Sequence, residues 1–132
     1  MKQYQEALKF ITLKHNGQKR LNGNPYIIHP IRVSQEVSSD LQKTCALLHD
    51  VIEDTETSVE EISKIFGFEV ATIVEILTHR KGESYLDYIK RIVLNDDAVA
   101  IKIADICDNL CDSPSSHAIE KSAQALDILI NK

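Results

Sequence analysis

Apolar residues recur at helical spacing along most of this chain, and that periodicity constrains its fold more than any other feature. Tyr4, Ala7, Leu8 and Ile11 show the pattern first, since positions i, i+3, i+4 and i+7 share one face of an α-helix. Similar spacing returns in later segments, which glycine, proline and serine separate. We therefore predict an all-α fold, a compact helical bundle of about seven to eight helices.

Signals at the segment ends place these helices. Ser58 followed by Glu61 is typical of a capping box, and Gly67 is typical of a helix end. Residues 99–103 also alternate as a strand would, but the apolar helical spacing continues to Leu110, so length favours a helix. The first expected helix carries the stripe from Tyr4 to Ile11 and is broken at Gly17. Further helices are expected over residues 30–37, 41–50, 58–67, 68–78, 85–94 and 97–111, and a last helix begins at Ser115 or Ser116.

Length and composition fit one compact domain. With 132 residues, of which 43% are hydrophobic, residues 1–132 are expected to fold around a single core. No run approaches the roughly 18 to 20 apolar residues that span a membrane, and the N-terminus lacks a signal-peptide core. The three cysteines are odd in number and lack CxxC spacing, which predicts reduced thiols. We therefore expect a cytoplasmic protein with no membrane contact.

The charge balance narrows the choice of partners. Fifteen basic and twenty acidic residues give a net charge of −5, which argues against nucleic-acid binding because phosphate contacts need a basic surface. A small phosphorylated nucleotide remains possible if a metal ion and a few Lys or Arg side chains meet its charge locally. The apolar C-terminal segment leaves a homo-oligomer open.

Four residues, His29, His49, Asp50 and Asp105, are candidate ligands of one divalent metal ion. An apolar run passes straight into His49 and Asp50, and ionisable groups buried without partners would be costly. Adjacent helix residues point about 100° apart, so both reach one ion most easily where the helix ends. Imidazole nitrogen and carboxylate oxygen suit manganese, which we take as the first candidate, or iron, cobalt or zinc.

Three segments then occur in a specific order: residues 24–33 around His29, residues 47–55 around His49-Asp50, and residues 101–110 around Asp105. Their content and spacing resemble the HD superfamily of metal-dependent phosphohydrolases. Within it they resemble the hydrolase domain of the RelA/SpoT family and the stand-alone small alarmone hydrolases, which remove the 3′-pyrophosphate of ppGpp and pppGpp. The resemblance implies an HD-type helical bundle and a hydrolase that releases pyrophosphate and leaves GDP or GTP.

The same resemblance implies roles for further residues. Glu53 and Asp54 follow the His-Asp pair as the catalytic acidic pair does in the alarmone hydrolases, although a solvated acidic helix end is the simpler interpretation of such a pair. Arg20 matches an arginine that stacks on the guanine base, and Asn109 matches an asparagine beside the nucleotide. Lys102, one turn before Asp105, is expected to contact phosphate or to pair with that carboxylate.

The chain also departs from the family pattern. Leu21 stands where the family often has a second basic residue, and Cys111 and Asp112 stand where Arg is often followed by Thr or Asp. Two positive charges are therefore missing near the expected substrate. This leaves two alternatives open: an HD phosphohydrolase that acts on another nucleotide, and a metal-free module that binds nucleotide for regulation.

Overall fold

The computed structural model describes residues 2–131, which form eight helices of at least eight residues and one single-turn helix, without a β-strand. The all-α prediction is therefore confirmed. In chain order the helices are α1 (Lys2–Lys14), α2 (Ile28–Gln35), α3 (Asp40–Leu48), α4 (Val51–Asp54), α5 (Val59–Phe66), α6 (Phe68–Ile76), α7 (Tyr85–Ile92), α8 (Asp96–Leu110) and α9 (Ser116–Ile130). Within the described residues, no helix is both long enough and apolar enough to cross a membrane.

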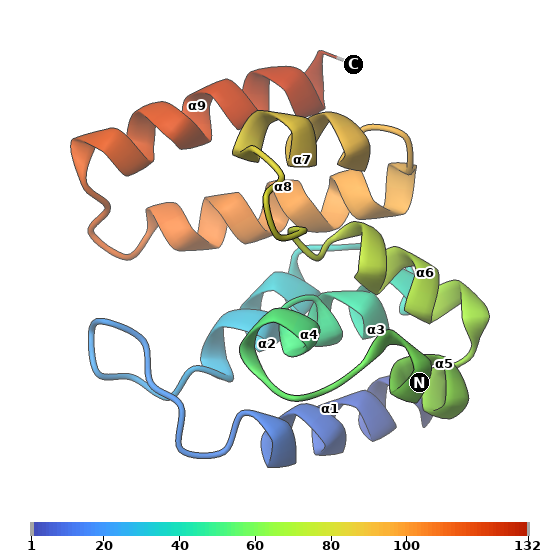
Figure 1. Ribbon diagram of the computed structural model, residues 1–132. Helices are drawn as coiled ribbons and strands as arrows, with labels where there is room; N and C mark the ends of the chain where they lie inside the picture. The colour runs from blue at the N-terminus through green and yellow to red at the C-terminus, as the bar shows by residue number, and fades with distance from the viewer. Residues whose placement is uncertain (1, 132) are drawn as a thin grey trace.

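Helices α3 and α8 form the centre of the bundle (Figure 1). α3 packs against α1, α2, α6 and α8, and α8 also contacts α2, α6, α7 and α9. In Figure 1, α7, α8 and α9 lie together above the helices of the N-terminal half. Leu47 and Leu48 of α3 and Ile101 of α8 are completely buried in the shared core. The two central helices thus build the core, and three of the four candidate ligands lie on α8 or directly after the end of α3.

Serine caps begin several helices as predicted. The side chains of Ser58, Ser84 and Ser115 each accept a hydrogen bond from the backbone N–H three residues further on. Such caps satisfy backbone donors that the first turn of a helix leaves without an intrahelical partner. Residues 99–103 lie inside α8, so the helical interpretation of that ambiguous stretch is correct.

One helix boundary differs from the prediction and shapes the site. We expected the third helix to run to Asp50, but α3 ends at Leu48 and the separate turn α4 begins at Val51. The backbone N–H of His49 bonds to the carbonyl of Ala46, three residues back, which tightens the helix end. Because the chain turns here, the adjacent side chains of His49 and Asp50 reach the same point.

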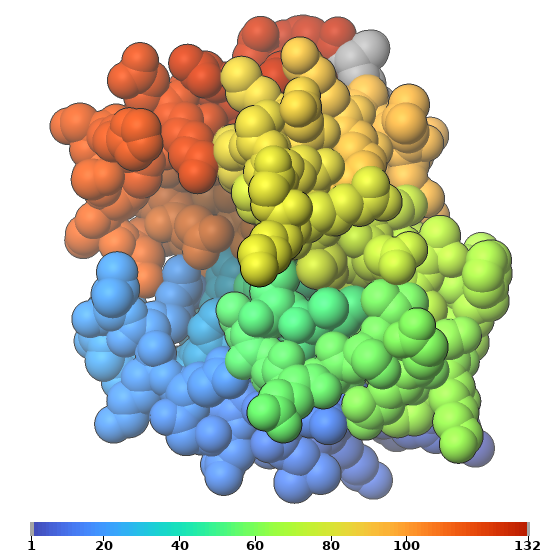
Figure 2. All heavy atoms as spheres, viewed as in Figure 1, coloured from blue at the N-terminus to red at the C-terminus, as the bar shows by residue number. Residues whose placement is uncertain are grey.

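The C-terminal helix and the first long loop both close onto α8. On α9, Ala125 and Leu129 are buried against the core, whereas Ile130 is 62% exposed. The loop after α1 lies against the C-terminal end of α8, where Asn22 Nδ2 donates to Asp112 Oδ1 over 2.6 Å. Figure 2 shows this blue loop next to the orange segment that follows α8. The loop therefore places residues 20–26 beside the polar face of α8.

Candidate metal centre

The structure brings the four predicted ligands together from three places in the chain. His29 comes from the first turn of α2, His49 and Asp50 from the break between α3 and α4, and Asp105 from the middle of α8. Each offers one ligand atom, and these atoms all lie within 4.8 Å of one another. Both histidines and Asp105 are buried, whereas the Asp50 side chain is 23% exposed. The cluster is therefore closed toward the core and reaches solvent on the side of Asp50.

The ligand atoms converge on a small space. Nε2 of His29 lies 2.8 Å from Asp105 Oδ1, and Nε2 of His49 lies 3.3 Å from the same oxygen. His49 Nε2 is also 3.1 Å from Asp50 Oδ2. Two imidazole nitrogens and two carboxylate oxygens suit a divalent ion such as manganese, iron, cobalt or zinc. The donor set thus fits a divalent metal ion.

Each of the four candidate ligands has a polar partner outside the cluster. His49 Nδ1 donates to the carbonyl oxygen of Ala46 over 2.6 Å, so Nε2 is the nitrogen that faces the cluster. Asp105 Oδ2 accepts from Lys102 Nζ over 2.8 Å, and the Tyr26 hydroxyl donates to Asp50 Oδ2. Such outer contacts orient metal ligands and tune their basicity.

His29 has an outer partner that sequence reasoning missed. Its Nδ1 donates to Asp108 Oδ2 over 2.7 Å, and Asp108 is buried on α8 one turn beyond Asp105. The sequence alone predicted no role for Asp108. Its position three residues after Asp105, hence on the same helix face, was the signal that pointed toward the site.

Electrostatics in the cluster follow from close packing of opposite charges. Burial alone would raise the pKa of Asp105, but Lys102 and His49 hold it well below its usual range. Burial would lower the pKa of His49, yet Asp50 and Asp105 raise it well above the ordinary value. His49 must therefore give up its Nε2 proton before that nitrogen can serve as a ligand.

Glu53 and Asp54 lie at the exposed edge of the cluster, on α4. Glu53 Oε1 accepts a hydrogen bond of 2.5 Å from the backbone N–H of His79, which ties α4 to the loop after α6. Loss of hydration raises the pKa of both carboxyls, and the charge of Asp50 raises them further. Both carboxyls at this edge of the cluster therefore hold their protons to a higher pH than free carboxyls do.

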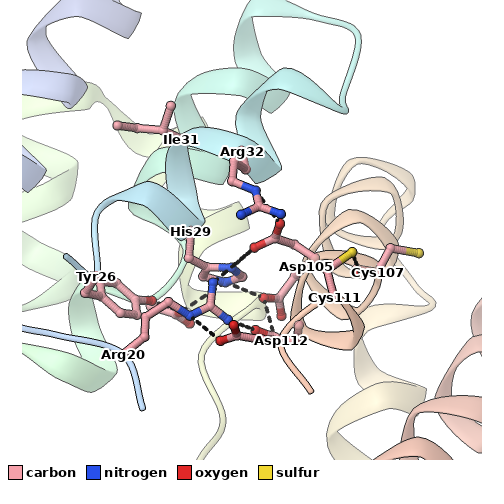
Figure 3. A network of polar contacts seen from close by, with 12 residues as sticks. Arg20, Tyr26, His29, Ile31, Arg32, Asp105, Cys107, Cys111 and Asp112 are labelled. Carbon is pink, nitrogen blue, oxygen red and sulfur yellow. Dashed lines mark hydrogen bonds and ion pairs between the residues drawn. The ribbon is translucent and has the colours of Figure 1, made fainter. Parts of the chain in front are cut away.

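The predicted substrate residues also gather beside the cluster. Arg20 donates to Asn109 Oδ1 over 2.9 Å and pairs with Asp108 at 3.2 Å and with Asp112 at 3.1 Å. Asn109 Nδ2 lies 3.3 Å from Asp105 Oδ1, which joins this group to the candidate ligands. In Figure 3, Arg20 and Arg32 approach His29 from opposite sides.

Lys102 is bound to Asp105 instead of extending into solvent. Its side chain is only 13% exposed, and its ammonium also lies 5.0 Å from the centre of the Tyr88 ring. Of the two contacts expected for Lys102, the structure shows the pairing with the carboxylate. Leu21, in contrast, is fully exposed at the surface of the loop after α1.

Comparison with known proteins agrees with this geometry. A model of the HD domain family matches residues 7–124. The chain belongs to the HD domain family. Among curated relatives, this HD domain is 35% identical over 120 residues to guanosine-3′,5′-bis(diphosphate) 3′-pyrophosphohydrolase MESH1 of Danio rerio, covering 81% of this chain and 67% of the relative.

Two further comparisons concern a long relative and a solved structure. The HD domain is 37% identical over 118 residues to guanosine-3′,5′-bis(diphosphate) 3′-pyrophosphohydrolase of Aquifex aeolicus, which covers 80% of this chain but only 17% of that protein. A solved structure described as a metazoan orthologue of SpoT that hydrolyses ppGpp superposes with a TM-score of 0.78. Its sequence is 28% identical, and the match covers 99% of this chain and 85% of the other.

Proposed function

We propose that this HD domain, residues 1–132, is a metal-dependent phosphohydrolase that removes the 3′-pyrophosphate of (p)ppGpp, giving GDP or GTP and pyrophosphate. The observation that carries the proposal is the cluster of His29, His49, Asp50 and Asp105, whose ligand atoms lie within 4.8 Å of one another. The names of the relatives, including the MESH1 hydrolase of Danio rerio, support the same substrate.

In this proposal the four clustered residues hold the ion, with manganese as the first candidate because its common ligands include imidazole and carboxylate. A bound divalent ion supplies a water of lowered pKa and polarises the phosphoryl oxygen under attack. The outer contacts keep the ligands in place: Lys102 occupies one oxygen of Asp105 and leaves the other toward the cluster. These outer contacts support the proposal that the cluster is a hydrolytic metal site.

Glu53 and Asp54 manage the protons of the reaction. One carboxylate accepts a proton from the attacking water, and one carboxylic acid protonates the ribose 3′ oxygen as its bond to phosphorus breaks. The new bond joins the water oxygen to that phosphorus, so pyrophosphate leaves and the 3′ hydroxyl is restored. Their raised pKa values favour this exchange, because a carboxyl with a raised pKa is a stronger base when ionised and stays protonated to a higher pH.

Arg20 is proposed to stack on the guanine base. Its guanidinium is held edge-on by Asp108, Asp112 and Asn109, so its charge is largely balanced and its planar face is the part suited to a ring. Asn109 would lie beside the nucleotide. Lys102, whose ammonium is bound to Asp105, is proposed to act on the substrate only through that carboxylate.

One observation favours a second candidate, a phosphohydrolase of the same fold that acts on another nucleotide. Asp112 pairs with Arg20, and Leu21 contributes no charge at the neighbouring position. The positive charge available to a ligand with two pyrophosphates is therefore small. A nucleotide with fewer phosphates would need less of it.

The test is pyrophosphate release from ppGpp by the purified protein with Mn²⁺ and with EDTA, beside a panel of other nucleotides. We expect the wild type to release pyrophosphate with Mn²⁺ but not with EDTA, and Asp105→Ala to release none in either condition. Glu53→Gln should lower kcat by about 10² to 10⁴-fold. Glu60→Gln, an exposed acid on α5, is the matched control and should keep full activity. Cleavage of another nucleotide but not ppGpp would transfer the assignment to the second candidate, and silence toward all of them would favour the regulatory module.

A further inference from the structure

Asp108 has a buried carboxylate and is not one of the four candidate ligands. Its side chain is 8% exposed, and it lies on α8 between the cluster and the loop after α1. Three cationic or donor groups converge on it: His29 Nδ1 at 2.7 Å, Arg20 Nη1 at 3.2 Å and Arg32 Nε at 2.9 Å. A carboxylate this deep is costly unless it is fully paired, and these contacts provide the pairing.

The three contacts are distributed over both carboxylate oxygens of Asp108. Oδ2 accepts hydrogen bonds from His29 and Arg20, and Oδ1 forms an ion pair with Arg32. Since both oxygens are held, the carboxylate cannot turn away from His29 without breaking an ion pair. In Figure 3, the two arginines that pair with Asp108, Arg32 and Arg20, lie on either side of the labelled His29.

The His29 ring is in consequence fixed at both nitrogens by one helix. Nε2 lies 2.8 Å from Asp105 Oδ1, and Nδ1 donates to Asp108 Oδ2, so two residues three apart on α8 face opposite edges of the imidazole. His49 differs, because its Nδ1–H donates to a backbone carbonyl. His29 is thus the histidine of the cluster whose outer acceptor is a side chain that mutation can remove.

We propose that Asp108 is a positioning residue of the metal centre: it accepts a hydrogen bond from the Nδ1–H of His29 and so presents Nε2 to the ion. This inference rests on the proposed function, since it requires that the cluster binds a metal. A carboxylate acceptor fixes the tautomer and orientation of a ligand histidine and makes its other nitrogen a stronger donor to a metal. Arg20 and Arg32 act one step further out by holding Asp108 itself.

Asp112 provides a matched control within the same network. It pairs with Arg20 at 3.1 Å, as Asp108 does at 3.2 Å, and both acids follow Asp105 near the end of α8. The contacts of Asp112 are with Arg20 and Asn22, and none is with His29. Asp112→Asn therefore disturbs the arginine without touching the ligand.

The experiment measures Mn²⁺ affinity from the electron paramagnetic resonance signal of free Mn²⁺ during titration of the metal-free protein, so it needs no substrate. Asp108→Ala should weaken binding by about 10 to 100-fold, the usual effect of losing an outer partner. Asp108→Asn keeps the shape and an oxygen acceptor, so its affinity should fall between alanine and wild type. Asp112→Asn should bind within about threefold of wild type, since no outer partner is lost.

The outcomes separate the two proposals. If wild type binds Mn²⁺ and Asp108→Ala binds it equally well, or no worse than Asp112→Asn, the positioning role is wrong and the proposed function survives. If wild type binds no Mn²⁺, both are wrong. Should the alanine variant fail to fold by circular dichroism in EDTA, the asparagine variant decides, because wild-type affinity at lower charge would show that Asp108 does not tune His29.

Discussion

Replacing Lys102 with methionine tests whether the cluster is built to receive a cation. Lys102 Nζ lies 2.8 Å from Asp105 Oδ2, and the two side chains are 13% and 5% exposed. Methionine retains most of the length and packing of lysine but removes its charge. The carboxylate of Asp105 would then lose its one permanently charged neighbour among the contacts described above.

The size of the effect follows from that distance. Two unit charges 2.8 Å apart attract by about 6 kcal/mol at an effective dielectric constant of about 20. Part of this is offset because the variant no longer buries an ammonium group. Breaking a buried pair by removing one partner costs about 3 to 5 kcal/mol, so we expect that loss of unfolding free energy in the metal-free protein. The loss is large against a total stability of about 5 to 15 kcal/mol for a domain.

A divalent cation bound by Asp105 would replace the missing charge. Unlike the anionic outer partner Asp108, Lys102 is a cation that repels a bound metal ion, so its loss should favour the metal. The stability loss should therefore be smaller in Mn²⁺ than in EDTA, and by linkage the variant should bind Mn²⁺ more tightly than wild type. Each 1.4 kcal/mol of difference between the two conditions corresponds to about a tenfold change in affinity.

Urea unfolding followed by circular dichroism, with EDTA and with Mn²⁺, measures both quantities. Lys90→Met, which removes an exposed lysine of α7, is the matched control and should lose little in either condition. An equal loss for Lys102→Met in EDTA and in Mn²⁺ would refute the reasoning, because the metal would then not compensate the lost charge. So would a loss no larger than that of Lys90→Met.

Two further predictions concern groups away from the cluster. Cys107 and Cys111 are exposed, whereas burial raises the pKa of the Cys45 thiol to about 12. A thiol reagent should therefore modify Cys107 and Cys111 in the native protein and Cys45 only after denaturation. Fast modification of all three cysteines in the native protein would contradict this. The Arg91 guanidinium, which donates to Glu83, lowers the pKa of that carboxyl from 4.5 to about 2. A carboxyl whose pKa is lowered by folding stabilises the folded state at pH values above its unfolded-state pKa. The difference in stability between wild type and Glu83→Gln should therefore be constant at neutral pH and disappear as the pH falls from 4.5 toward 2. Melting temperatures measured across this acid range test the prediction.

The loop that Glu83 holds illustrates a site feature that no local pattern predicts. Arg91 donates to the carbonyls of Ile76 and Thr78 as well as to Glu83, and this fixes the segment between α6 and α7. The same segment presents the backbone N–H of His79 to Glu53. The contact that His79 makes with Glu53 comes from its backbone, and a backbone N–H has no residue type that a sequence pattern could identify.

Helix positions and caps were predictable because they depend on neighbours. Apolar spacing over three turns decided that residues 99–103 are helical, and Ser58 capped α5 through a donor three positions away. Such interactions join residues only a few positions apart, so the order of residues in the sequence is enough to predict them. The end of α3 was placed two residues too late, because apolar periodicity alone does not show where a chain turns.

By itself, the sequence determined the helical architecture and the four candidate ligands, since periodicity, capping residues and the order of His29, His49-Asp50 and Asp105 are readable along the chain. Only the tertiary structure decided what stands behind those ligands. The bond between His29 and Asp108 joins residues 79 positions apart, and the ion pair between Arg20 and Asp108 joins residues 88 apart. In the sequence, Asp108 cannot be distinguished from a surface carboxylate. Its burial and its pairing with His29 and Arg20 arise only when α2 and the loop after α1 pack against α8.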